Sequence, residues 1–403
     1  MSGFTVPDDL VVRDGDGGRI VLMVMDGIGG LPGPGGRTEL EAARTPNLDR
    51  LATQSSLGIL DPVAPGVTPG SGPGHLSLFG YDPLVWRIGR GALSALGIGF
   101  DLRPGDLAVR LNLATLDTSG NVMDRRAGRP PDAEGERIVA KMQAEVTAPD
   151  GVQIWLRPVK EHRAVLVVRG SDLWADLEDT DPQETGVPPL PVTATDPRAE
   201  ATARLVQDLL GQAREAIAGE PVINGILARG FARHDGIPSL RERFGLRSTV
   251  IAKYPMYRGV ARLVGMTVDG VPGDDAETVR MLSDAWGRFD YHFLHFKATD
   301  ARGEDGDFDA KVAAAEAIDA LVPEVLALEP DVLIVTGDHS TPATYAAHSW
   351  HGVPVLISSP WCRPTATAFG ECECRTGDLG RFRGKELMSL ALAHAGRLEK
   401  YGA

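Results

Sequence analysis

The chain has 403 residues, 43% of them hydrophobic, and a formal net charge of −14. This length is enough for about two domains with sizeable cores. The negative charge and the lack of any run of Lys and Arg exclude a protein that grips the phosphate backbone of nucleic acid, because such binding needs a basic face. No stretch approaches the roughly twenty apolar residues of a membrane-spanning helix. The acidic amino-terminal segment around Asp8 and Asp16 lacks the pattern of a signal peptide, so we expect a soluble, cytoplasmic protein without nucleic-acid or membrane partners.

The first predicted elements are a strand, a loop and a helix. Residues 20–25 form a short apolar run that predicts a buried strand ending at Asp26. A loop rich in Gly and Pro, residues 29–36, follows. Thr45 then provides a possible helix cap, and Pro46 suits the first turn of a helix.

A second loop rich in Gly and Pro, residues 65–74, contains Ser71 and precedes a predicted helix that begins near residues 75–79. The glycines on both sides of Ser71 let the backbone approach an anion, and the amino end of a helix favours negative charge. No Lys follows as in a Walker A loop, and the pattern is not GxSxG. A serine beside metal ions can attack phosphorus, so Ser71 is a candidate nucleophile, with a flexible turn as the alternative interpretation.

Residues 101–237 differ from the rest of the chain in their pattern of predicted strands and helices. They contain short mixed strands and two predicted helices, residues 131–146 and 197–218, but no apolar run that ends in an acidic residue. We therefore predict that they form an inserted domain, and that residues 1–100 and 238–403 together form the other, discontinuous domain.

After the insert, predicted strands alternate with predicted helices. The strands are residues 248–252, 293–299 and 332–336, and the helices are residues 276–289 and 308–328. Such alternation implies a mainly parallel sheet. The predicted fold class is α/β: a mainly parallel sheet flanked by helices, with an inserted smaller α/β (α+β) domain.

Three of the apolar runs end in acidic residues, at Asp26, Asp300 and Asp338-His339. Because ligands gather at the carboxyl ends of parallel strands, these side chains should meet at one edge of the sheet. The nearby His348 and His351 can reach the same edge. Carboxylate together with imidazole suits a divalent ion such as Mn or Zn better than Ca, so we predict a metal site.

Basic residues cluster in the predicted insert: Arg110, Arg125, Arg126, Arg129 and Arg163. Guanidinium groups bind phosphate and carboxylate through paired hydrogen bonds, so the cluster could hold a small dianionic substrate. The alternative is that these are exposed arginines in loops. Lys253 follows a predicted strand of the other domain and could bridge both halves of the site.

These motifs together resemble those of a known family, the archaeal-type 2,3-bisphosphoglycerate-independent phosphoglycerate mutases of the alkaline phosphatase superfamily. The resemblance extends over nearly the whole chain and depends on residues 24–27, 45–49, 68–76, 79–83, 97–99, 124–129, 337–342, 348–349 and 353–355. The segment with Ser71 and the Gly337-Asp338-His339-Ser340 segment are specific in combination.

The resemblance implies two divalent metal ions, with Mn as the expected metal and Mg, Co or Zn as alternatives. One would be bound by Asp26, Ser71, Asp338 and His339, and the other by Asp300, His348 and the residue four positions after Asp300. The family usually has His at that position, whereas this chain has Glu304. Glu304 adds negative charge and favours Mn or Mg over Zn. We prefer it to His351 as the ligand because it occupies the expected place in the pattern.

The resemblance also implies an enzyme of glycolysis and gluconeogenesis that interconverts 3-phosphoglycerate and 2-phosphoglycerate through a phosphoserine at Ser71. Lys253 would bridge to the phosphate, Asp124 would shuttle a proton, and Arg110, Arg125, Arg126 and Arg129 would bind substrate. The second domain would trap the glycerate and exclude water. The alternatives are a metal-dependent phosphatase or phosphonate hydrolase on the same fold and, from another class, a non-catalytic protein that binds a metabolite. The sequence does not indicate an oligomeric state.

Overall fold

The computed structural model describes residues 3–13 and 17–402, so Asp16 of the acidic amino-terminal segment lies outside the described residues. The chain divides into two compact units, Met1–Arg87 with Ile237–Ala403 and Ile88–Gly236. The prediction placed the boundaries between the two domains after residue 100 and after residue 237. The second unit begins earlier, at Ile88, because helix α4 (Arg90–Gly97) packs on strands β3 and β7 of that unit. No helix in the described part of the chain is long and apolar enough to cross a membrane, and a cytoplasmic location stays a prediction.

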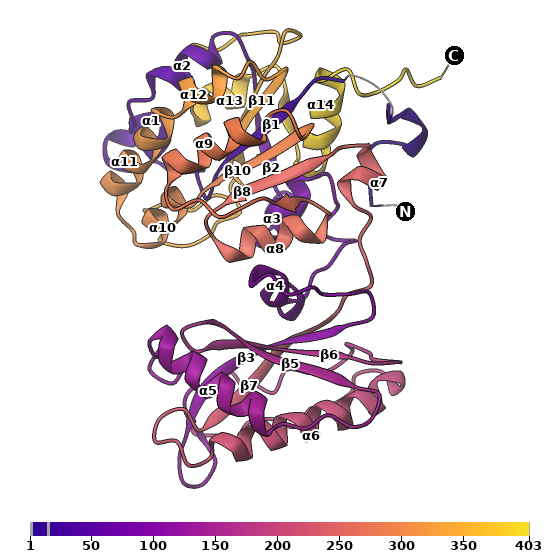
Figure 1. Cartoon of the computed structure of the whole chain (residues 1–403). Helices are drawn as coiled ribbons and strands as arrows, with labels where there is room; N and C mark the ends of the chain where they lie inside the picture. Colours follow the sequence, from indigo (N-terminus) through magenta and orange to yellow (C-terminus); the bar gives the residue numbers. More distant parts are fainter. Residues whose placement is uncertain (1–2, 14–16, 403) are drawn as a thin grey trace. The chain divides into compact units, whose positions relative to one another are not determined.

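The first unit is built on an eight-stranded sheet in which a single strand, β12, runs against its neighbours (Figure 1). In spatial order the strands are β13 (Gly380–Arg383), β2 (Ser56–Asp61), β12 (Val353–Ser358), β11 (Val332–Thr336), β1 (Ile20–Met25), β10 (Tyr291–Phe296), β8 (Ser248–Ala252) and β9 (Thr267–Val268). The central strands β11, β1 and β10 are buried along their whole length, as expected for parallel strands covered on both faces.

Most helices of the first unit fall into two groups. A chain of contacts links α1, α2, α9, α10, α11 and α12, and another links α3, α8 and α14, while α13 packs on β2 and β12. Their bounds are α1 (Glu39–Ala42), α2 (Pro46–Ala52), α3 (Ser71–Leu78), α7 (Leu240–Phe244), α8 (Pro255–Leu263), α9 (Asp275–Ala285), α10 (Ala298–Glu304), α11 (Phe308–Asp319), α12 (Val322–Leu326), α13 (Glu371–Thr376) and α14 (Leu387–His394). The predicted sheet flanked by helices is therefore confirmed.

Three details differ from the expectation. The strand before Asp300 ends at Phe296, and Asp300 lies in the first turn of helix α10 instead of at a strand end. The helix predicted for 308–328 is two helices, because Pro323 has no N–H to continue the hydrogen bonds of α11. Thr45 makes no capping hydrogen bond to helix α2; the carboxylate of Asp319 accepts hydrogen bonds from its first backbone N–H groups instead.

The second unit has an antiparallel sheet of β3 (Leu107–Leu116), β4 (Val122–Asp124), β5 (Gln153–Lys160), β6 (Arg163–Arg169) and β7 (Gly225–Arg233). Its core forms where one face of the sheet packs on α5 (Asp132–Glu145) and α6 (Glu200–Ile217). Figure 1 shows α4 on the other side of this sheet. Because side chains alternate along a strand, Arg110 and Asn112 of β3 lie on the face away from that core.

Candidate metal centre and catalytic site

Asp26, Asp338 and His339 come together at the carboxyl ends of β1 and β11. All three side chains are fully buried, and their ligand atoms lie within 4.8 Å of one another. Nε2 of His339 is 3.2 Å from Oδ1 of Asp26 and 3.2 Å from Oδ2 of Asp338. The parallel register of the two strands, in which Val24 pairs with Thr336, accounts for this meeting.

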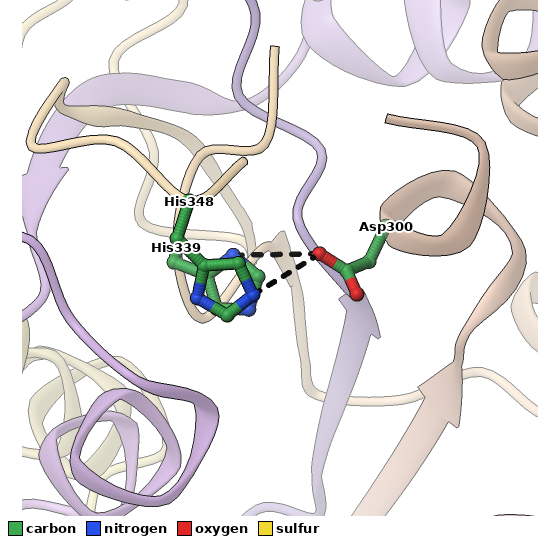
Figure 2. A group of neighbouring side chains, drawn as sticks. All are labelled: Asp300, His339 and His348. Carbon is green, nitrogen blue, oxygen red and sulfur yellow. Dashed lines mark ion pairs between the residues drawn. The ribbon is translucent and has the colours of Figure 1, made fainter. Parts of the chain in front are cut away.

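A second group consists of Asp300, His339 and His348, whose ligand atoms also lie within 4.8 Å of one another. Figure 2 shows both histidines directed toward the Asp300 carboxylate. Oδ1 of Asp300 is 3.8 Å from Nδ1 of His339 and 3.6 Å from Nε2 of His348, and the two imidazole rings stack with centroids 3.7 Å apart. His339 therefore belongs to both groups.

The donor set fits a bound cation. Oδ1 of Asp26 and Oδ2 of Asp338 are buried and have no hydrogen-bond partner, although buried carboxylates need compensating charge. Burial by itself would raise the pKa of Asp26, yet its contacts with His295 and His339 and the charge of Lys297 hold this pKa well below its usual value. Burial lowers the pKa of His339, but Asp338 and Asp26 raise it to about 9. The carboxylates around His339 thus favour a positive charge at this position.

Lys297 and His295 contact Asp26 and were not among the predicted site residues. Oδ2 of Asp26 is 3.0 Å from Nε2 of His295 and accepts a hydrogen bond from Nζ of Lys297 at 3.2 Å. The same ammonium donates to Oδ2 of Asp300 at 2.5 Å and to the hydroxyl of Tyr257 at 2.8 Å. Met25 pairs with Phe296, so the next residues along the two strands, Asp26 and Lys297, lie opposite each other. Knowledge of this strand pairing would have predicted their contact.

Ser71 is the first residue of helix α3 and lies beside the shared histidine. Its Oγ is 3.3 Å from Nε2 of His339. The helix approaches the end of β11 closely, since a Cβ on Gly74 would lie 2.3 Å from the carbonyl oxygen of Asp338. His75, buried one turn later, places its Nδ1 2.8 Å from the Ser71 carbonyl oxygen and 3.2 Å from Oδ2 of Asp338.

Glu304 and His351 occupy different positions relative to the second group. Glu304 ends helix α10, and its Oε1 is 3.7 Å from Nε2 of His348, with the side chain 55% exposed. Like Glu304, His351 belongs to neither group; its ring stacks on Trp350 and its Nδ1 is 3.1 Å from the Ser349 hydroxyl. Of the two alternatives, Glu304 is the residue beside His348.

Arginines gather on the face of the second unit's sheet that also carries α4. Arg110 of β3 lies beside Arg229 of β7, and Arg163 is on the neighbouring strand β6. Burial, and then the charges of Arg163, Arg90, Arg229 and Arg126, lower the pKa of Arg110 to about 10. The Nε atoms of Arg110 and Arg163 are buried without a hydrogen-bond partner, so this cluster suits an anionic ligand. Arg90 and Arg229 were not predicted members.

The other predicted substrate and catalytic residues have contacts of their own. Arg125 forms a paired salt bridge with Asp181, at 2.8 Å for both hydrogen bonds. Asp124 accepts hydrogen bonds from the backbone N–H groups of Arg126 and Gly128, which holds the turn that leads to Arg129, an exposed residue with a φ of 54°. In the first unit, Lys253 follows β8 and donates to the carbonyl oxygen of Gly273 at 2.6 Å.

Known proteins resemble this chain over nearly its whole length. The family model described as 2,3-bisphosphoglycerate-independent phosphoglycerate mutase matches residues 52–223. A probable 2,3-bisphosphoglycerate-independent phosphoglycerate mutase of Thermus thermophilus is 54% identical over 390 residues, 96% of either chain. A protein of the same description from Deinococcus radiodurans is 49% identical over 393 residues, again 96% of each.

Solved structures agree. The cofactor-independent phosphoglycerate mutase of Thermoplasma acidophilum superposes with a TM-score of 0.76 at 30% identity, covering 94% of this chain and 100% of that one. A protein from Pyrococcus horikoshii gives a TM-score of 0.81 at 30% identity, over 96% of this chain and 100% of that one. The predicted resemblance is confirmed: the chain belongs to the family of 2,3-bisphosphoglycerate-independent phosphoglycerate mutases.

Proposed function

We propose that this chain interconverts 3-phosphoglycerate and 2-phosphoglycerate without bisphosphoglycerate, through a phosphoserine at Ser71 and with two divalent metal ions. The observation that carries the proposal is the position of the Ser71 hydroxyl, 3.3 Å from a histidine shared by both groups of potential metal ligands. A nucleophile beside such a centre is the arrangement that phosphoryl transfer requires.

Asp26, Ser71, Asp338 and His339 would hold one ion, and Asp300, Glu304 and His348 the other. The buried oxygens of Asp26 and Asp338 that accept no hydrogen bond support the first assignment, and the closeness of Glu304 to His348 supports the second. Two or more carboxylates around each site favour Mn or Mg over softer ions. Bound ions would offset charge on the phosphoryl oxygens and lower the pKa of the serine hydroxyl.

Ser71 Oγ would lose its proton and attack the phosphorus of 3-phosphoglycerate as the bond to the C3 oxygen breaks, and that oxygen would take up a proton. The retained glycerate would then turn, and its C2 hydroxyl would lose its proton and attack the same phosphorus. The bond between phosphorus and Oγ would break, and Oγ would take up a proton to restore Ser71. The arginines around Arg110, including Arg126, would hold the anionic groups of the substrate during this turn. Lys253 would contact the phosphate and Asp124 would carry a proton. Arg129 would add a further contact to substrate, whereas Arg125 would act mainly through Asp181.

The test is the conversion itself. Protein stripped of metal and reloaded with Mn²⁺ should convert 3-phosphoglycerate into 2-phosphoglycerate without added bisphosphoglycerate, followed by ³¹P NMR. Ser71→Ala should abolish the conversion, while Ser55→Ala, which removes only a hydroxyl bonded to the carbonyl oxygen of Leu51, should retain it. Release of inorganic phosphate as the sole product would reject the mutase and identify a phosphatase.

A further inference from the structure

Lys311 of helix α11 is a fully buried lysine outside both groups of potential metal ligands. Its Nζ donates to three backbone carbonyl oxygens: Gly27 at 3.0 Å, Gly29 at 3.2 Å and Thr341 at 2.8 Å. Oε1 of Glu39 lies 3.9 Å from the same nitrogen. An ammonium has three N–H donors, so every one of them is used.

The three carbonyls belong to two loops that are far apart in the sequence. Gly27 and Gly29 follow β1 and Asp26, whereas Thr341 follows β11, Asp338 and His339. The backbone N–H of Thr341 also bonds to the carbonyl oxygens of Gly27 and Gly29, at 3.1 Å each. Lys311 therefore joins the two loops at the point where they meet.

The same loops make direct contacts with the candidate ligands. The N–H of Gly27 donates to Oδ1 of Asp338 at 3.3 Å. The Thr341 hydroxyl donates to Oδ1 of Asp300 at 2.6 Å and lies 2.9 Å from Nδ1 of His339. A shift of the loop with Gly27 would therefore move a ligand of the first group, and a shift of the loop with Thr341 would move Asp300 and the shared His339.

We propose that Lys311 is a positioning residue, a tethered cation that fixes both loops and so holds Asp26, Asp338, His339 and Asp300 in a metal-binding arrangement. This inference rests on the proposed metal centre. It differs from a purely stabilising role because it requires the affinity for metal to depend on a hydrogen-bonding cation at this position.

The test measures Mn²⁺ affinity by calorimetry on metal-free protein. Lys311→Ala should bind Mn²⁺ about 10- to 100-fold more weakly, which is the loss of affinity typical when a residue that orients metal ligands is replaced. Propylammonium, which supplies the lost chain and its N–H donors, should restore part of the affinity. Tetramethylammonium, a cation without N–H donors, should not.

Val325→Ala in helix α12 is the control for stability alone: it removes buried apolar contacts and should lower the unfolding temperature while leaving Mn²⁺ affinity unchanged. If folded Lys311→Ala binds Mn²⁺ like the unmodified protein, the inference is overturned. If Lys311→Ala does not fold, Lys311→Met decides, since it keeps a buried unbranched side chain and removes the N–H donors; weaker Mn²⁺ binding supports the inference and unchanged binding rejects it. Failure of the unmodified protein to bind Mn²⁺ would instead reject the proposed metal centre.

Discussion

Glu304 would give the proposed second metal site a carboxylate at the position where the resemblance to the family implies an imidazole. This carboxylate lies 3.7 Å from Nε2 of His348. A carboxylate is a harder ligand than imidazole and brings a negative charge. The second metal position should therefore discriminate between hard and borderline ions differently from a site with two histidines.

Glu304→His tests this discrimination. The substitution should raise the ratio of Zn²⁺ affinity to Mn²⁺ affinity by about tenfold or more. Imidazole is a good ligand for Zn²⁺, and loss of the negative charge lowers the affinity for Mn²⁺. Competition binding with the two ions measures the ratio. His351→Ala is the matched control and should leave the ratio unchanged, since this ring stacks on Trp350. A change of metal preference in His351→Ala alone would assign the ligand to His351.

Individual residues show where prediction from sequence succeeded and where it could not. Asp26 and Asp338 were predictable as neighbours because each follows a buried apolar run, and parallel strands align their carboxyl ends. Lys297 was not, because its contact with Asp26 depends on the pairing of Met25 with Phe296. Arg125 stays a predicted substrate ligand, but its salt bridge with Asp181 could not be predicted because the two residues lie 56 positions apart in the sequence.

At the scale of elements, helix α2 is held at its start by a residue from another helix. Oδ1 of Asp319, at the end of α11, accepts hydrogen bonds from the N–H groups of Asn47 at 3.1 Å and Leu48 at 2.7 Å. Its Oδ2 accepts from the side-chain amide of Asn47 at 2.9 Å. Local patterns suggest a cap from the preceding residue, Thr45, so only the tertiary structure could reveal this one.

Asp319→Ala should therefore destabilise the protein by about 1–3 kcal/mol, since it leaves buried N–H groups at the helix start without an acceptor. Urea unfolding followed by circular dichroism measures the change. Asp309→Ala, an exposed carboxylate in the first turn of α11, should change the free energy of unfolding by no more than about 0.5 kcal/mol. Equal effects of the two substitutions would contradict the assignment of Asp319 as the cap.

For the whole molecule, the change in the pattern of predicted strands and helices along the sequence predicted an inserted domain. The chain does form two units with different sheets. The first unit holds every candidate metal ligand, and the second holds the arginine cluster. The exact start of the second unit could not be predicted from the sequence, because nothing in residues 88–100 shows that α4 packs on β3 and β7. The gathering of Arg110, Arg163 and Arg229 was equally hidden, because it depends on strand register.

This division of residues between the units predicts that substrate binding and metal binding can be separated by substitution. Arg110→Met should lower kcat/KM for 3-phosphoglycerate by about 10- to 100-fold, the effect of losing a hydrogen bond between charged groups. Mn²⁺ affinity should be unchanged, because all candidate ligands lie in the other unit. Stability should hold or rise, since the substitution removes a charge crowded by other arginines. Arg204→Met, an exposed arginine on α6, is the control and should alter none of the three quantities. A fall in Mn²⁺ affinity with Arg110→Met would show that the cluster supports the metal centre, and an unchanged kcat/KM would remove Arg110 from the substrate site.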